Sequence, residues 1–495
     1  MASQSAIAEG GSVVTADQIN YEQKMFSHPS YRFDPQFSNT FGQSIVLGAS
    51  QVPVTINIPP EVFNLAQSYL LYSVNIPAGA QIGGNNSYIW YAQNALKEIS
   101  HIQFYAGSNM WIVDLDNLQN YLDITLKKEL SQDEFLSESA LTGISKSNSL
   151  VNVVPALRNS NTTTTNTANL AANPSDVNYT EPAYFQVGEL NTAVSYVVQF
   201  PLRLIKNTAF SIDKNLYFAQ TTYLKVYFGP TSKICYLSTS NANPSAGTKA
   251  TYTPGAGNAS IGAATAPIQP IQFQLMLAVE TNQALRTMTM EKVATSGLSY
   301  LIPYVQAFKN SNSGTSQNIS IQLDQGNGRS LMKVYHAPYN SQEDLDTMYD
   351  HANTPYNAAA AVNPDALGAP VNQKVTSYYT QLNGRRNEDI NVDCYFTGPF
   401  LDYMQHKRQL RGSILSNVNL YQYNWFVCND WSDFGPRYDQ DNKGELVSGI
   451  PMSVSPLTWS FIGLTMRSAN NNFQHYTWFV FIKKLTMSPG TVLVQ

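Results

Sequence analysis

The feature that most constrains this chain is a two-residue alternation of apolar and polar side chains in many short segments. Between Val52 and Ile58, valine and isoleucine occupy every second position, with Pro53, Thr55 and Asn57 between them. Successive side chains of a β-strand point to opposite faces, so this alternation predicts a half-buried strand. The pattern recurs, separated by Gly, Pro and Asn, at 70–76, 102–104, 194–200, 224–228 and 273–279. The first half of the chain is therefore predicted to consist mostly of strands.

The second half of the chain repeats the pattern of the first. Three pairs of segments match in order, namely 52–76 with 319–336, 183–200 with 377–400, and 273–279 with 473–482. A repeat of this length is a unit of fold, so two tandem domains of similar strand order are predicted. The boundary is expected after Glu280. We predict an N-terminal arm at 1–39, a first domain at 40–281 and a second domain at 282–495.

One helix is predicted among the strands of the first domain. Asp114 is a candidate N-cap, and Lys127 and Lys128 lie toward the C-terminal end, where the helix dipole favours cations. The apolar stripe consists of Leu115, Leu118, Leu122 and Leu126. We expect this helix to pack on the β-sheets, and a helix that binds a separate partner is the alternative.

The chain carries few charges for its size. Of its 495 residues 13% are charged, against about 25% in an average soluble protein, and 30 are tyrosine. Protein interfaces are depleted in Lys, Glu and Asp and enriched in Tyr, so this composition indicates extensive contact between copies of the chain. The net charge of −5 and an N-terminus without Lys or Arg in its first 23 residues argue against a protein that neutralises nucleic acid.

No motif in the sequence predicts catalysis, a cofactor or a metal. The six histidines and three cysteines have no metal-binding spacing, and a structural role is expected for His101, His336 and His475, which lie in strand-like segments. A calcium loop after Asp430 is disfavoured because Lys443 and Ile450 occupy ligand positions. We therefore expect no enzyme activity and no catalytic, cofactor-binding or metal-binding residues. The thiols of Cys235, Cys394 and Cys428 are expected to be buried.

Two small basic clusters complete the charged features. Arg385 and Arg386 lie in a predicted turn, and Lys407, Arg408 and Arg411 lie in or beside a predicted short helix at 401–410. Neither cluster is flanked by the aromatic platforms of single-strand binders, so solvated faces or salt links between subunits are predicted. The sequence shows no signal peptide and no apolar run near the roughly 18 residues that span a bilayer, so we expect a soluble protein made in the cytoplasm.

Several segments in common order resemble the double jelly-roll major capsid proteins of tailless icosahedral bacteriophages and of the adenovirus hexon. The resemblance extends over about residues 40–495 and depends on order more than on any single motif. The segments that carry it are 98–105 before the predicted helix, 196–205, 223–228, 299–304 and 420–430, the last of which ends in WFVCND.

The resemblance implies an all-β fold of two tandem eight-stranded jelly rolls, with long loops and a few short helices. It implies a major capsid protein that forms homotrimers of pseudo-hexagonal outline, which tile an icosahedral virion shell. Its partners would be itself, neighbouring capsomers, penton or minor capsid proteins and, where present, an internal membrane, without sequence-specific nucleic-acid binding. Candidates for surface towers are the long loops at 159–176, 238–270 and 352–370.

Two other interpretations stay open from the residues alone. The many Tyr, Trp and Asn residues also suit a jelly-roll carbohydrate-binding protein, such as an attachment or spike protein. A glycoside hydrolase on a β-sandwich would need two positioned carboxylates, and the sequence favours no particular pair.

Overall fold

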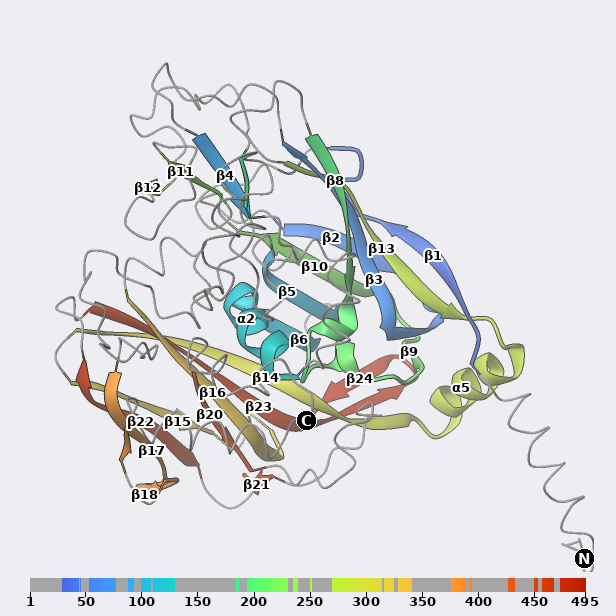
Figure 1. Ribbon diagram of the computed structural model, residues 1–495. Helices are drawn as coiled ribbons and strands as arrows, with labels where there is room; N and C mark the ends of the chain where they lie inside the picture. The colour runs from blue at the N-terminus through green and yellow to red at the C-terminus, as the bar shows by residue number, and fades with distance from the viewer. Residues whose placement is uncertain are drawn as a thin grey trace, which may run out of the picture.

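The chain folds into two β-sandwich units joined by helix α5 (Gln283–Thr295) (Figure 1). The first unit is built from strands between residues 31 and 280, and the second from strands between residues 298 and 494. The computed structural model describes residues 29–43, 45, 53–76, 88–92, 99–107, 110–129, 184–186, 194–229, 235–238, 250–251, 269–313, 316–324, 328–340, 375–388, 391–393, 426–431, 449–452, 456–466 and 472–495.

The first unit consists of two facing antiparallel sheets. One has the order β1-β13-β3-β8 with β9 paired to β3, and the other has the order β2-β10-β5-β6. A small third sheet has the order β12-β11-β4-β7. The strands are β1 (Tyr31–Phe37), β2 (Pro53–Ile58), β3 (Val62–Ile76), β4 (Tyr88–Ala92), β5 (Ile99–Ala106), β6 (Met110–Asp116), β7 (Tyr184–Gln186), β8 (Val194–Pro201), β9 (Leu216–Tyr217), β10 (Thr222–Phe228), β11 (Cys235–Ser238), β12 (Ala250–Thr251) and β13 (Gln269–Glu280).

The second unit also consists of two facing antiparallel sheets. One has the order β14-β23-β16-β20, with β21 paired to β16 and β24 to β23. The other has the order β15-β22-β17-β18, with β19 paired to β17. The strands are β14 (Leu298–Ser313), β15 (Gln317–Leu323), β16 (Ser330–Asn340), β17 (Val375–Leu382), β18 (Arg385–Arg386), β19 (Val392–Asp393), β20 (Val427–Asp430), β21 (Ile450–Pro451), β22 (Leu457–Met466), β23 (Asn472–Ser488) and β24 (Thr491–Val494).

The two units have the same strand order. When the eight main strands of each unit are numbered along the chain, both units have one sheet ordered 1-8-3-6 and one ordered 2-7-4-5. Eight strands in two facing sheets with crossing connections form a jelly roll, so the predicted all-β class with two tandem jelly rolls is confirmed. We call the two kinds of layer the 1-8-3-6 sheet and the 2-7-4-5 sheet.

Two of the three predicted segment matches hold in the structure. β2 and β3 occupy the same positions in their unit as β15 and β16, and β13 matches β23 as the eighth strand. The match of 183–200 with 377–400 is wrong: β7 lies in the small third sheet whereas β17 is the fourth main strand of its unit, and β8 is a main strand whereas β19 only pairs with β17 beside the main order. Short Tyr-containing strands resemble one another wherever they occur in a sandwich, so this echo carried no positional information.

Helix α2 (Leu118–Glu129) begins later than the sequence predicts. Asp114 belongs to β6, where its carboxylate accepts a hydrogen bond from Gln103 at 3.0 Å and therefore does not cap the helix. Asn117, with a left-handed φ of 54°, separates strand from helix. Leu115 and Leu118 are both buried, one on the strand and one on the helix. Their spacing therefore fits one continuous helical stripe, although the backbone changes from strand to helix between them.

Helix α2 is wedged between the two units. Its Leu118, Tyr121 and Leu122 are fully buried in an apolar cluster that fills the first sandwich and continues into the second unit. The ring centroid of Tyr121 lies 6.2 Å from that of Tyr335 and 5.9 Å from that of Trp478, both in the second unit. The apolar stripe of this helix thus packs within the chain. A second cluster fills the second sandwich.

The predicted N-terminal arm contains a strand of the first sheet. β1 pairs with β13 from Tyr31 opposite Glu280 to Phe37 opposite Gln274, so the sheet begins before residue 40. Residues 1–28, the loops at 159–176 and 352–370, the segment 401–410 and most of 238–270 lie outside the described residues.

Candidate assembly surface

In the second unit, the outer face of the 1-8-3-6 sheet is an internal interface. Tyr335 on β16 and Trp478 on β23 point out of this sheet and are fully buried against Tyr121 of α2. β6 of the first unit also lies against β14 and β24. The first unit therefore covers this face with its helix and with the edge of its 2-7-4-5 sheet.

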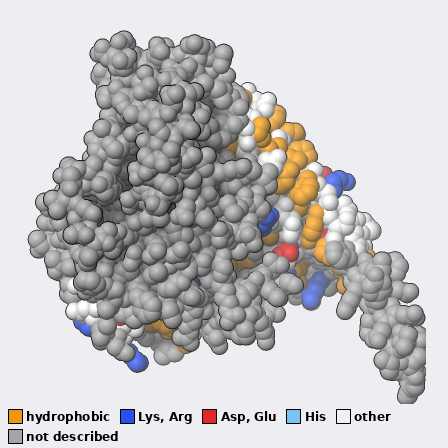
Figure 2. Space-filling view, viewed as in Figure 1, with side chains coloured by type: hydrophobic (Ala, Val, Ile, Leu, Met, Phe, Trp, Pro, Cys, Tyr) orange, Lys and Arg blue, Asp and Glu red, His pale blue; other side chains and the backbone are white. Residues whose placement is uncertain are grey.

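In the first unit, the equivalent outer face is exposed and still apolar. Phe33 and Phe37 of β1 are 45% and 54% exposed, and Val197 of β8 is 59% exposed. Between these strands, Met276 of β13 lies opposite Tyr69 of β3. Figure 2 shows hydrophobic side chains gathered on the side of the molecule where β1, β13 and β3 lie. We call this surface, defined by these five residues, the open face.

Strand β1 directs its aromatic side chains outward and its polar side chains toward the core side, which is the reverse of the usual arrangement in a β-sandwich. Arg32 and Asp34 lie opposite core residues of β13, whereas Phe33 and Phe37 belong to the open face. Full burial of a large apolar side chain stabilises a protein by about 1.5–3 kcal/mol, and part of that gain is lost while these two rings are about half exposed. Contiguous exposed apolar surface marks a binding site, so the reversal makes the open face a candidate interaction surface.

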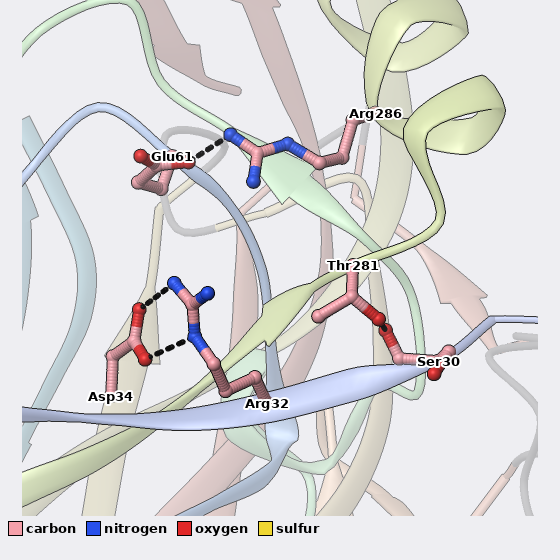
Figure 3. Close-up of polar contacts among 6 residues, drawn as sticks. All are labelled: Ser30, Arg32, Asp34, Glu61, Thr281 and Arg286. Atoms are coloured by element: carbon pink, nitrogen blue, oxygen red, sulfur yellow. Dashed lines mark hydrogen bonds and ion pairs between the residues drawn. The ribbon is translucent and has the colours of Figure 1, made fainter.

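Two ion pairs lie at the sandwich edge beside the open face (Figure 3). Arg32 donates from Nε and Nη2 to the two carboxylate oxygens of Asp34 at 2.6 and 2.7 Å. Arg286 of α5 donates to Glu61 at 2.6 Å. The hydrogen bond from Arg32 lowers the pKa of Asp34, and the same bond raises the pKa of Arg32. A charged border next to an apolar centre is the usual anatomy of a protein interface.

The buried carboxylate of Glu280 holds the junction between the units. Its Oε1 accepts hydrogen bonds from the backbone N–H groups of Ser30 and Asn282, both at 2.9 Å. Its Oε2 accepts from Nδ2 of Asn215 at 2.8 Å. The carbonyl of Asn215 in turn accepts from the hydroxyl of Tyr300 on β14, at 3.1 Å. One carboxylate thus fixes the start of the first sheet and of α5, and through Asn215 also the entry of the second unit.

The 2-7-4-5 sheet of the first unit carries an aromatic cluster, which bears on the sugar-binding alternative. Tyr105 is only 8% exposed. Its centroid lies 4.8 Å from that of Trp111 and 5.2 Å from that of Tyr223, and the Lys225 ammonium lies 5.0 Å from it. A sugar ring stacks on an open aromatic face, and neighbouring side chains already occupy the surroundings of Tyr105. This cluster is packed and does not favour a sugar platform.

The histidines predicted to be structural are bound by neighbouring side chains. His101 Nε2 lies 2.7 Å from Oδ1 of Asp114. His336 and His475 are fully buried and contact each other. Among the described residues, no group of three or more His, Cys, Asp or Glu is placed to hold a metal. The described helices include none with the length and apolar character needed to cross a membrane.

The remaining predicted features fall partly within the structure. Arg385 and Arg386 follow the turn instead of forming it, because Asn383 and Gly384 have the left-handed φ values of 49° and 78°. Both arginines are exposed, and the Arg386 guanidinium lies 3.7 Å from the ring centroid of Tyr379. Cys428 is buried, as expected. Outside the described residues lie His28, His351, His406, Cys394, the basic cluster at 407–411 and residues 432–445.

Solved structures that are similar to this chain over most of its length include viral capsid proteins. The chain is similar to the capsid protein of the virus PBCV-1, with a TM-score of 0.54 and 11% identity over 94% of this chain and 97% of that chain. It is also similar to the Faustovirus major capsid protein, with a TM-score of 0.52 and 10% identity over 93% of this chain and 91% of that chain. The chain has a double jelly-roll fold. No family model matches the sequence of this double jelly-roll chain, and no curated protein matches it.

Proposed function

We propose that this double jelly-roll chain builds a viral capsid, with three copies forming a trimer of pseudo-hexagonal outline and trimers tiling an icosahedral shell. The observation that carries the proposal is the open face, an apolar sheet surface whose counterpart in the second unit is covered. The fold supports the same class, because its structural neighbours are capsid proteins. Such a role needs no catalysis, and we propose none.

A second copy of the chain is the occupant that fits the open face. Within one chain, the α2 side of the first unit covers the 1-8-3-6 sheet of the second. Because both units have the same strand order, the same contact can repeat between chains, with the second unit of one copy covering the open face of the next. A head-to-tail contact of this kind closes into a ring when its rotation allows. Three chains of two units then supply six similar positions.

The proposal sets the location and partners of the protein. It belongs in the virion, after synthesis in the host cytoplasm. Its partners are other copies of itself, neighbouring capsomers, and penton or minor capsid proteins. The low charge fraction of 13% supports this assignment, because surfaces that are buried between subunits are depleted in Lys, Glu and Asp.

Size-exclusion chromatography with light scattering tests the proposal. The wild-type chain of 54.8 kDa is expected at three times its own mass, and negative-stain images are expected to show pseudo-hexagonal particles. The double variant Phe33→Asp, Phe37→Asp should shift the mass to that of a monomer. Asn318→Asp with Gln322→Asp adds the same charge at exposed positions of β15 and should keep the trimer. A monomeric wild type would sink the proposal, and a trimer untouched by the Phe33 and Phe37 changes would exclude the open face as its contact.

A further inference from the structure

Two buried imidazoles link the sheets of the second unit. Nε2 of His336 on β16 lies 3.2 Å from Nδ1 of His475 on β23, and both side chains are 0% exposed. Nδ1 of His336 lies 2.8 Å from the hydroxyl oxygen of Thr477. Nε2 of His475 lies 2.8 Å from Oε1 of Gln317 on β15. Because β15 belongs to one sheet and β16 and β23 to the other, this row of polar groups crosses the core.

The contacts specify one arrangement of protons when both imidazoles are neutral. The amide oxygen of Gln317 only accepts, so Nε2 of His475 carries a hydrogen and its Nδ1 is an acceptor. His336 then donates from Nε2, and its Nδ1 accepts from the Thr477 hydroxyl. An extra proton on Nδ1 of His475 would face the N–H of His336. An extra proton on Nδ1 of His336 would place a charge in the core beside a second imidazole.

The surroundings of the pair are aromatic. The ring centroids of Phe461 and Trp459 lie 4.4 and 5.3 Å from that of His336, and the centroid of Phe473 lies 6.4 Å from that of His475. The pKa of His336 lies well below its ordinary value. Burial is the main cause, and the neighbouring His475 is the second. A charge in this apolar setting is costly, and two charged imidazoles whose ring nitrogens lie 3.2 Å apart would also repel each other, so the core disfavours protonation of the pair.

Titratable groups on the surrounding strands have contacts of their own. β15 and β22 carry no charged residue in their sequences. Lys333 on β16 forms a buried ion pair with Asp430 on β20 at 3.7 Å. The Glu388 carboxylate accepts from the backbone and hydroxyl of Thr380. Lys309 of β14 lies over the ring of Tyr476, Lys483 of β23 lies over the ring of Tyr304, and Tyr378 of β17 stacks on Phe461.

We propose that His336 and His475 make the second unit acid-labile, so that acid opens this unit before the first. The folded unit disfavours protons on this buried pair, whereas the imidazoles of the opened unit bind protons with the ordinary pKa of about 6.5. The stabilising effect of neutral burial is therefore complete above about pH 6.5 and is lost as the pH falls below it. At pH 5 the folded-to-open ratio falls about 30-fold for each imidazole that stays neutral. The consequence of this acid lability for a capsid shell rests on the proposed function: acid would loosen the second units and the contacts that they make with other subunits.

Hydrogen–deuterium exchange of the full chain at pH 7.5 and pH 5.0 tests the proposal, with rates corrected for intrinsic exchange. Peptides covering 330–340 and 472–482 should open at least ten times more at pH 5.0, and peptides covering 222–228 and 273–279 should change less. An equal acid effect in both units would overturn the inference. This comparison needs no variant, so it decides the matter even if substitutions in the core fail to fold.

A non-titrating variant then assigns the effect to the pair. His336→Gln with His475→Gln should flatten the pH dependence in the second unit, and His101→Gln, at the partly exposed histidine of the first unit, should not. An unchanged pH dependence in the double variant would refute the role of the pair. Light scattering on the same samples separates this inference from the assembly proposal. If the chain is a monomer and its second unit is selectively acid-labile, the acid-lability inference is upheld and the assembly proposal is contradicted.

Discussion

The two jelly rolls share a strand order but treat the outer face of their 1-8-3-6 sheet differently. In the second unit this face is buried under α2, with Tyr335 and Trp478 at 0% exposure. In the first unit the equivalent face leaves Phe33 and Phe37 about half exposed. Strand order alone does not require either outcome. The difference shows that the chain itself covers one of the two faces and leaves the other exposed, which is the face that a second copy covers in the proposed trimer.

Removing the central side chain of the covered face should give the largest effect. Trp478→Ala empties a fully buried site between the units and should lower the free energy of unfolding by about 3–5 kcal/mol, as measured by urea denaturation. Trp478→Phe retains a ring and should cost less. A loss below about 1 kcal/mol for the alanine variant would show that this face is not a packed interface.

The junction between the two units, one with the covered face and one with the open face, depends on Glu280. Glu280→Ala leaves three hydrogen-bond donors without their acceptor and should cost about 2–4 kcal/mol in the same measurement. Glu280→Gln keeps one carbonyl oxygen for the two backbone N–H groups and should cost less. Equal losses for the two variants would mean that side-chain volume at this site matters more than its hydrogen bonds.

The edge where the units meet should respond to acid through Asp114. Burial raises the pKa of Asp114, but hydrogen bonds from His101 and Gln103 outweigh burial and lower it overall. Because the folded pKa lies below the unfolded one, this stabilisation is present above about pH 4 and is lost as the pH falls through the folded value. Asp114→Asn should therefore cost about 0.5–1 kcal/mol at pH 7 and progressively less as the pH falls below about 4. A cost that stays constant as the pH falls through this range would contradict the assignment.

The smallest effect on the isolated chain is expected on the open face. Phe33→Ser should change the unfolding free energy of the monomer by less than about 0.5 kcal/mol, because the ring is 45% exposed. The same change at Phe63, which is 0% exposed on β3, should cost several times more. Dilution of the wild type and of Phe33→Ser, followed by light scattering, should show earlier dissociation of the variant. Identical dissociation would remove Phe33 from the subunit contact.

Strand positions could be predicted from the sequence because alternation is local, whereas the open face could not. The segment around Phe33 and Phe37 alternates aromatic with polar residues, but an alternating strand does not reveal which of its faces is buried. The start of α2 was misplaced because Leu115 and Leu118 fit one stripe on either side of the left-handed Asn117. The pairing of His336 with His475 joins residues 139 positions apart and depends on sheet register, which the sequence pattern does not contain.

The point where the chain enters the first unit is also the point where it leaves. Thr281 donates from its backbone N–H and its hydroxyl to the carbonyl of Ser30, at 2.7 and 2.8 Å (Figure 3). In both units the first and the last main strands are hydrogen-bonded neighbours. A module whose ends meet can be copied in tandem without rerouting either copy, and a linker as short as α5 joins the two. Gene duplication of a single ancestral module is therefore sufficient to produce this architecture, after which the two outer faces could diverge in what they recognise.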